Sequence, residues 1–104
     1  MSYRKKSQPA FQLYASDLMA DRRYRLMTLE ERGLLLSLLC ECWVNQYLPD
    51  SQDELSRLLG VDVKAVGRAL TEAVLSFFQR GKSGLYCPGL EEYRLAARNR
   101  LRMR

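Results

Sequence analysis

Three features of the sequence predict a mainly α-helical fold that carries one small β-hairpin. A capping box at Thr28 opens a long leucine-rich segment. Residues 55–70 have the spacing of a helix-turn-helix, and the glycine-rich residues 81–84 lie between two short segments that contain aromatic side chains. With 104 residues, of which 47% are apolar, the chain is long enough for one core and too short for two. Three helices followed directly by a hairpin indicate a winged helix-turn-helix.

The chain divides into a flexible basic arm (residues 1–10), a winged-helix domain (residues 11–90) and a basic C-terminal helix (residues 91–104). The arm has three consecutive bases among serines and a proline, a composition typical of a solvated terminus. After it, two apolar residues alternate with Gln12, which predicts a short first strand. Ser16 is placed to cap a single helical turn that runs from residue 17 to residue 20.

The segment from Thr28 to about Asn45 is predicted to form one long helix. The Thr28 hydroxyl and the carboxylate of Glu31 can each satisfy a free backbone amide at its start. Its polar side chains share one narrow stripe, and apolar side chains fill most of the remaining circumference. We interpret it as a central core helix. The alternative is that part of its apolar surface pairs with another subunit.

The helix-turn-helix follows the sequence Leu-Pro-Asp at residues 48–50, which ends the long helix. Ser51 and Glu54 offer a second capping box for a short helix that ends at Leu59. Gly60 can then adopt the left-handed conformation that a tight turn requires.

The second half of the domain is predicted to contain one more helix and the hairpin. Asp62 is placed to cap a helix that extends to Phe77 on one apolar face. Strands at residues 77–80 and 85–88 are expected on the two sides of the glycine-rich turn, with a proline closing the second strand. A last, basic helix begins at Leu90. The predicted core consists of Leu35, Leu38, Leu39, Trp43, Leu55, Leu59, Val66 and Leu70.

The composition argues against an enzyme. The sequence has no histidine, so it lacks the nucleophile–histidine pairs and the mixed cysteine–histidine zinc sites that many enzymes use. The carboxylates of Asp17, Asp21 and Glu41 are isolated and predict no paired or metal-bound geometry. We therefore expect no catalytic activity, no cofactor and no metal.

The cysteines and the hydropathy pattern favour a cytoplasmic protein. Cys40 and Cys42 lie two apart on a predicted helix and do not face each other, and Cys87 makes the number odd. We expect three reduced thiols that act as small buried hydrophobes. The longest apolar stretch, residues 34–44, is too short for a membrane span, and no apolar segment follows the N-terminal bases as it would in a signal peptide.

The net charge of +5 is unevenly spread along the chain. Residues 1–10 and 91–104 each carry +3, residues 61–90 carry +2, and residues 11–60 carry −3. This asymmetry favours a polyanionic partner, above all nucleic acid, although basic ends are also common in solvated termini.

Candidate DNA-binding residues follow from the helix-turn-helix. If its second helix enters a major groove, Lys64, Gly67 and Arg68 lie on the outer face near its N-terminus. A glycine costs a helix interior about 1 kcal/mol relative to alanine, so Gly67 indicates close approach of either a packed helix or a phosphate. The alternative for the two bases is a solvated charged face. The further candidates lie in the hairpin, on the preceding helix and at the two ends: Arg80, Lys82, Arg57, Arg4, Lys5, Lys6, Arg98, Arg100 and Arg102.

The chain also resembles a known family, the YdaU-like phage and prophage proteins, over roughly residues 11–100. The residues that carry the resemblance are Phe11-Gln12-Leu13-Tyr14 with Asp17, Leu29-Glu30-Glu31-Arg32-Gly33, Trp43, Leu48-Pro49-Asp50, Phe77-Phe78 and the basic last helix. The resemblance implies an N-terminal winged-helix domain associated with phage replication initiation, and it supplies no catalytic motif. Members of that family are often longer, so an end at residue 104 indicates a fragment or a reduced member.

Two functions remain open at this point. The leading prediction is a DNA-binding winged helix that recognises a phage-type origin or operator. The alternative is an interaction module that uses the same fold to recruit a replisome component or to mediate oligomerisation. The predicted partner is duplex DNA; replication proteins and a second copy of the chain are further candidates, and a membrane is not expected.

Overall fold

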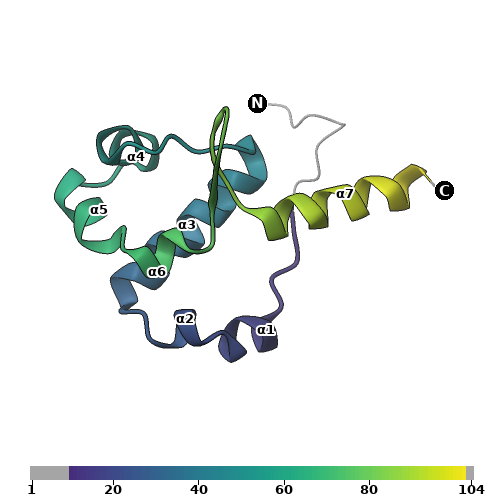
Figure 1. Cartoon of the computed structure of the whole chain (residues 1–104), viewed down its shortest axis with the longest axis horizontal. Coiled ribbons are helices and arrows are strands. Elements are labelled where there is room, and N and C mark those ends of the chain that lie inside the picture. Colours follow the sequence, from purple (N-terminus) through teal and green to yellow (C-terminus); the bar gives the residue numbers. More distant parts are fainter. Residues whose placement is uncertain (1–9, 103–104) are drawn as a thin grey trace.

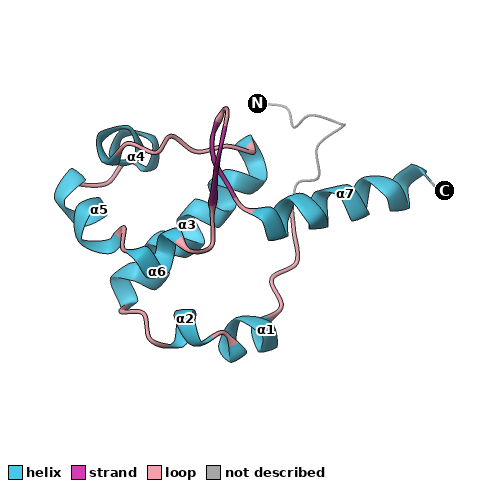
Figure 2. Cartoon of the chain, in the orientation of Figure 1, coloured by secondary structure: helices cyan, strands magenta, loops and turns pink. Residues whose placement is uncertain are grey.

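The computed structural model describes residues 10–102, with side chains for residues 10–100, so the predicted arm lies almost entirely outside the described residues. The fold is mainly helical and contains one small antiparallel sheet (Figures 1 and 2). None of the described helices is long and apolar enough to cross a membrane. The elements in chain order are α1 (Ala15–Ala20), α2 (Arg22–Arg25), α3 (Leu29–Asn45), α4 (Gln52–Leu59), α5 (Val63–Ala69), α6 (Glu72–Leu75), β1 (Gln79–Gly81), β2 (Gly84–Tyr86) and α7 (Pro88–Arg102).

Helix α3 is the centre of the fold. It contacts α5, α6 and α7, while α4 packs on α5 and α2 reaches α6. Figure 1 shows α4 and α5 on one side of α3, and α7 extending to the other side. Six of the eight predicted core residues are buried: Leu35, Leu38, Leu39, Trp43, Leu55 and Val66. Leu59 and Leu70 are only partly buried against that core.

The capping box of α3 is confirmed. The Thr28 hydroxyl accepts the backbone N–H of Glu31 at 3.1 Å, and the Glu31 carboxylate accepts the backbone N–H of Thr28 at 2.7 Å. The helix ends at Asn45, as predicted, where the following residue, Gln46, has a positive φ of 73°. The apolar surface is less completely covered than expected, because Cys40 is exposed and Val44 is 66% exposed.

The predicted third helix is wrong as a single element, because the segment is broken between α5 and α6. Leu70 leaves the helical region with ψ of 70°, and Thr71 is extended. The Thr71 hydroxyl donates a hydrogen bond to the Glu31 carboxylate at the start of α3. This contact and the full burial of Val74 compensate for the lost helical hydrogen bonds.

The predicted first strand is also wrong, since residues 11–14 form no regular structure. The ring of Phe11 instead packs on Trp43, with centroids 5.6 Å apart. The following helix begins at Ala15, with Tyr14 rather than Ser16 as its N-cap. The place beside the hairpin is taken by Leu48, whose backbone N–H and carbonyl each bond to Leu85 at 2.8 Å.

The hairpin is confirmed, with shorter strands than predicted. β1 and β2 pair antiparallel in the register Gln79↔Tyr86, Arg80↔Leu85, Gly81↔Gly84, so the connecting turn has two residues rather than four. Gly84 has φ of 129°, and a Cβ there would lie 2.2 Å from the Leu48 carbonyl oxygen, so no other residue fits. Pro88 does not close a strand but starts α7, because proline suits the first turn of a helix.

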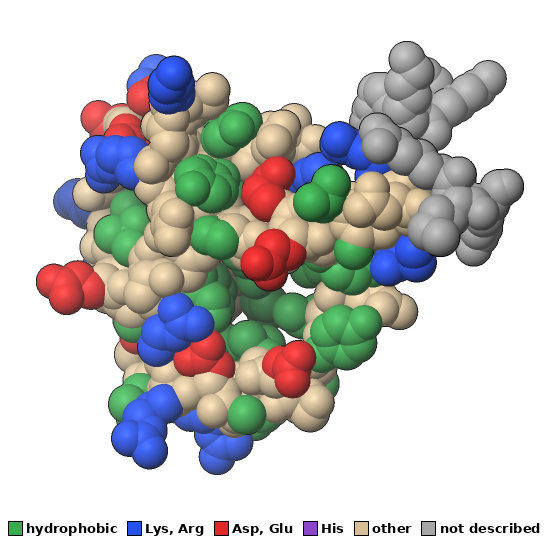
Figure 3. All heavy atoms as spheres, turned by 45° about the vertical axis from the view of Figure 1, so that its right-hand side comes forward, with side chains coloured by type: hydrophobic (Ala, Val, Ile, Leu, Met, Phe, Trp, Pro, Cys, Tyr) green, Lys and Arg blue, Asp and Glu red, His purple; other side chains and the backbone are tan. Residues whose placement is uncertain are grey.

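The segment that contains α1 and α2 is only lightly attached. Neither helix has a buried residue, and a cleft of about 320 Å³ lies between this segment and the core. Figure 3 shows a hollow with hydrophobic side chains inside it. Arg23 provides the main attachment, because its guanidinium donates to the Ser76 carbonyl at 3.0 Å and stacks on Phe77 at 3.8 Å from the ring centroid.

Candidate nucleic-acid interface

The turn between α4 and α5 is tight and is fixed by local hydrogen bonds. Gly60 ends α4 with φ of 70°, and its N–H donates to the Ser56 carbonyl at 2.9 Å. The Ser56 hydroxyl donates to the Val61 carbonyl at 2.6 Å, which ties the turn to α4. Asp62 caps α5 by accepting the backbone N–H groups of Lys64 and Ala65. These local contacts fix the direction in which α5 leaves the turn.

Gly67 lies next to the side chain of Gln52 at the start of α4. A Cβ at this position would lie 2.6 Å from the Gln52 amide nitrogen. That amide, at the start of α4, donates to the Val63 carbonyl of α5 at 3.0 Å. The sequence left two neighbours open for Gly67, a packed helix and a phosphate. In the structure the nearest atoms belong to a side chain of helix α4.

The two bases of α5 differ in their surroundings. Lys64 is exposed and has no ion-pair partner among residues 10–100. Arg68 pairs with Glu30 of α3, with the guanidinium nitrogen 3.1 Å from the carboxylate oxygen. Both side chains of this pair are more than half exposed, so the pair contributes little to stability and can exchange for another anion.

The two bases of the hairpin also differ, because one has an ion-pair partner and the other has none among the described residues. Lys82 is exposed in the two-residue turn, and no described acid pairs with it. Arg80 forms an ion pair with Asp50 at 2.9 Å, across the junction between the hairpin and the segment before α4. Arg57 on α4 is exposed and lacks an ion-pair partner in the described part of the chain.

The helix-turn-helix and hairpin together have no excess positive charge. Residues 50–83 contain five bases and five acids. Two of the acids, Asp62 and Glu72, lie at the N-terminal ends of α5 and α6, where a negative charge stabilises a helix. On the face shown in Figure 3, Lys and Arg side chains are scattered among Asp and Glu rather than gathered in one patch.

Only some of the predicted bases at the two ends of the chain lie among the described side chains. Arg98 and Arg100 are exposed, whereas the side chain of Arg102 and the bases Arg4, Lys5 and Lys6 lie outside the described residues. Arg94 was expected to belong to the basic end, yet it faces inward. Its guanidinium donates to the Trp43 and Cys42 carbonyls at 2.9 Å each and stacks over the Trp43 ring.

Compared with known proteins, the chain matches no family model, no curated protein sequence and no solved structure.

Two residues that position the candidate interface and α7 were not predicted from the sequence. Glu30 holds Arg68, and Arg94 holds α7 on the carbonyls at the end of α3. The hydrophobic position of Arg94, four residues after Leu90 on the same helix face, was the available signal for an inward direction. The Glu30–Arg68 pair joins positions 38 residues apart, and no local pattern predicts it.

The cysteines form no bond and no metal site. All three thiols are free; Cys40 is exposed, in contrast to the expectation, while Cys42 and Cys87 are buried. Burial raises the pKa of Cys42 to about 12 and also raises the pKa of Cys87. The described residues contain no group of cysteine and carboxylate side chains that could hold a metal ion.

Proposed function

We propose that this chain is a DNA-binding winged-helix domain. The observation that supports it best is the order α4, left-handed turn, α5, short helix α6, hairpin, with Leu48 adding a third, single-residue strand contact beside β2. In a winged helix the second helix of the pair lies in the major groove and the hairpin lies against the neighbouring backbone. The resemblance of the sequence to YdaU-like proteins makes phage or prophage replication the proposed setting, with an origin or operator as the site.

In this proposal the free bases on α5 and the hairpin position the domain. Lys64 would contact a phosphate or a base edge in the major groove, and Lys82 would contact the backbone beside it. Arg68 would exchange Glu30 for a guanine, whose O6 and N7 accept both hydrogen bonds of a guanidinium. Because the Arg68–Glu30 pair is exposed, this exchange costs little free energy.

The electrostatic part of the affinity would come from outside the helix-turn-helix. Residues 50–83 carry no net charge, so phosphate contacts would depend on Arg98 and Arg100 and on the basic N-terminal arm.

A specific observation favours the alternative function, an interaction module, as well. Three large apolar side chains, Leu26, Leu29 and Val44, are 79%, 84% and 66% exposed on or next to α3. Leu26 and Leu29 lie near the start of α3 and Val44 lies near its end, so exposed apolar side chains at either end would suit an interaction module that recruits a replisome component.

Fluorescence anisotropy with a labelled random duplex tests the proposal. The double variant Lys64→Ala/Lys82→Ala should weaken binding several-fold, since two contacts to the DNA are lost. Arg22→Ala is the matched control, because Arg22 is an exposed base on α2 and has no described ion-pair partner. Equal affinities for the double variant and for the wild-type chain would favour the interaction module.

A further inference from the structure

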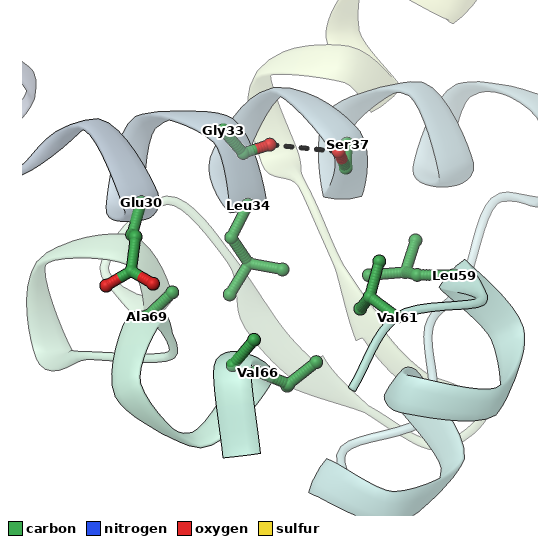
Figure 4. A pocket seen from close by; sticks show the side chains of 9 residues that line it. Glu30, Gly33, Leu34, Ser37, Leu59, Val61, Val66 and Ala69 are labelled. Carbon is green, nitrogen blue, oxygen red and sulfur yellow. Dashed lines mark hydrogen bonds between the residues drawn. The ribbon is translucent and has the colours of Figure 1, made fainter. Parts of the chain in front are cut away.

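A groove lies between α3 and the α4–α5 pair, and residues of the hydrophobic core form part of its lining. It has a volume of about 310 Å³. Figure 4 shows Leu34 of α3 pointing into it towards Val66 of α5, with Leu59 and Val61 closing one end. Leu34 and Val66 are buried, whereas Val61 is 46% exposed. The floor of the groove is therefore apolar and open to solvent at one end.

The rims of the groove are narrow and partly acidic. On the α3 rim the groove is bordered by Gly33 and Ser37, and the Ser37 hydroxyl is turned back onto the Gly33 carbonyl at 2.9 Å. A Cβ on Gly33 would meet nothing within 4 Å, so packing inside the chain does not explain this helix-interior glycine. Glu30 lies at one end of this rim. Glu41 lies about three turns from Glu30 on the same helix face, beyond the residues that line the groove.

The far half of α7 has the complementary properties. Figure 1 shows this helix extending from the body on the side opposite to α4 and α5. Its inner face carries Leu90 and Ala97, both buried. On its outer surface Leu95 is 56% exposed, and Arg98 and Arg100 form no ion pair with any described residue.

We propose that the groove binds the far half of α7 from a second copy of this chain. Leu95 would enter the apolar floor, and Arg98 would approach the acidic α3 rim. Glu41 is the better partner, because Glu30 already shares its carboxylate with Arg68, whereas no described cation pairs with Glu41. The α7 of the same chain points away from the groove, so the occupant comes from another copy. Reciprocal exchange of two α7 helices closes a two-fold dimer.

This inference goes beyond the proposed function and does not depend on it, and in the dimer Arg98 would contact α3 of the second copy rather than a phosphate. A two-fold dimer would present two copies of α5, as many helix-turn-helix proteins do, but the contact would form equally well in an interaction module. The experiments below contain no DNA, so their failure and a failure to bind DNA are separate results.

A charge exchange across the interface tests the proposal. The first variant, Glu30→Lys/Glu41→Lys, has a basic groove and a basic α7; the second, Arg98→Glu/Arg100→Glu, has an acidic groove and an acidic α7. In sedimentation velocity, the wild-type chain should dimerise and each variant alone should be monomeric. An equimolar mixture of the two variants should dimerise again, because both contacts then join opposite charges.

A single substitution keeps the test valid if a charge variant fails to fold. Leu95→Asp should raise the dimer dissociation constant at least tenfold, since Leu95 is the apolar anchor. Leu58→Asp is the matched control, because Leu58 is 45% exposed on α4 and does not line the groove. A monomeric wild-type chain at millimolar concentration would overturn the proposal. A mixture of the charge variants that stays monomeric would also overturn it. So would an equal change in the dimer dissociation constant for Leu95→Asp and Leu58→Asp.

Discussion

The face formed by α5 and the hairpin differs from α7 in how its bases are held. On the first, Arg68 and Arg80 are paired with acids on neighbouring elements, and only the lysines remain free. On α7, Arg94 is fixed on the end of α3, while no described acid forms an ion pair with Arg98 or Arg100. The structure therefore separates two tasks. One region offers a shaped, electrically balanced surface, and the other offers unpaired positive charge.

The attachment of the two regions differs as well. The α5 side is held by buried aliphatic residues and by the contact between Thr71 and Glu31. The α7 side is held by aromatic packing on Trp43, where Tyr93 stands edge-on at 5.5 Å and Arg94 stacks over the ring. Substitutions at Trp43, at Arg94 and at the start of α3, together with thiol labelling, test this difference.

Truncation of Trp43 should have the largest effect. Trp43→Ala should lower the free energy of unfolding by about 3 to 5 kcal/mol, because it removes a buried aromatic side chain together with the platform for α7. Chemical denaturation at neutral pH measures the change. An unchanged denaturation midpoint would show that α7 is not anchored at this residue.

Arg94→Met should have a moderate effect, about 2 kcal/mol, because it removes two charge-assisted hydrogen bonds and the cation–π contact while it keeps the apolar stem. Arg98→Met is the matched control on the same helix and should change stability by less than about 0.5 kcal/mol. If both variants lost the same stability, the distinction between anchored and free arginines on α7 would be wrong.

The start of α3 should respond to both mutation and pH. Thr28→Ala should cost about 1 kcal/mol, since it removes the N-cap. The backbone N–H of Thr28 and the Thr71 hydroxyl hold the pKa of Glu31 below its ordinary value. Glu31 therefore stabilises the fold above its ordinary pKa, and this contribution is lost as the pH falls.

Urea titrations of wild type and Glu31→Gln should accordingly differ most at neutral pH and converge in acid. A difference that stays constant with pH would show that the capping box does not act through the charge of Glu31.

The smallest expected effect is a change in the rate of thiol labelling, which reports on the attachment of α7 at a single residue. Cys40 is exposed and should react quickly, whereas Cys42 is buried and its raised pKa of about 12 keeps it protonated at neutral pH. Arg94→Met should speed the labelling of Cys42, because Arg94 covers the carbonyl of that residue. Mass spectrometry after timed alkylation separates the sites. Equal rates at Cys42 in wild type and variant would mean that α7 does not open there.

Local signals in the sequence were sufficient for most elements of the fold. The cap at Thr28, the left-handed Gly60 and the cap at Asp62 each depend on neighbours within a few residues, and all are confirmed. The break after Ala69 was missed because it depends on a contact between Thr71 and Glu31, 40 residues apart. The expected strand at residues 11–13 was an over-interpretation of two alternating apolar residues, since Leu48 occupies the place beside the hairpin.

The sequence predicted which elements carry the candidate residues, but it did not predict which of their charges are paired. Lys64, Arg68 and Lys82 lie on α5 and at the hairpin turn, where the pattern placed them. Charge patterns could not reveal that Arg68 and Arg80 pair with Glu30 and Asp50, because ion pairs between distant segments depend on the tertiary fold.

The salt dependence of DNA binding tests the central claim most directly. Anisotropy titrations of a random duplex at several salt concentrations measure how many phosphate contacts release counterions. We expect salt-dependent binding by the wild-type chain, and a slope of log affinity against log salt concentration that falls by up to about one unit per lost contact in Arg98→Ala/Arg100→Ala. Arg68→Ala should leave this slope nearly unchanged and should narrow the preference for a cognate site. Absence of salt-dependent binding to any duplex would contradict a DNA-binding function.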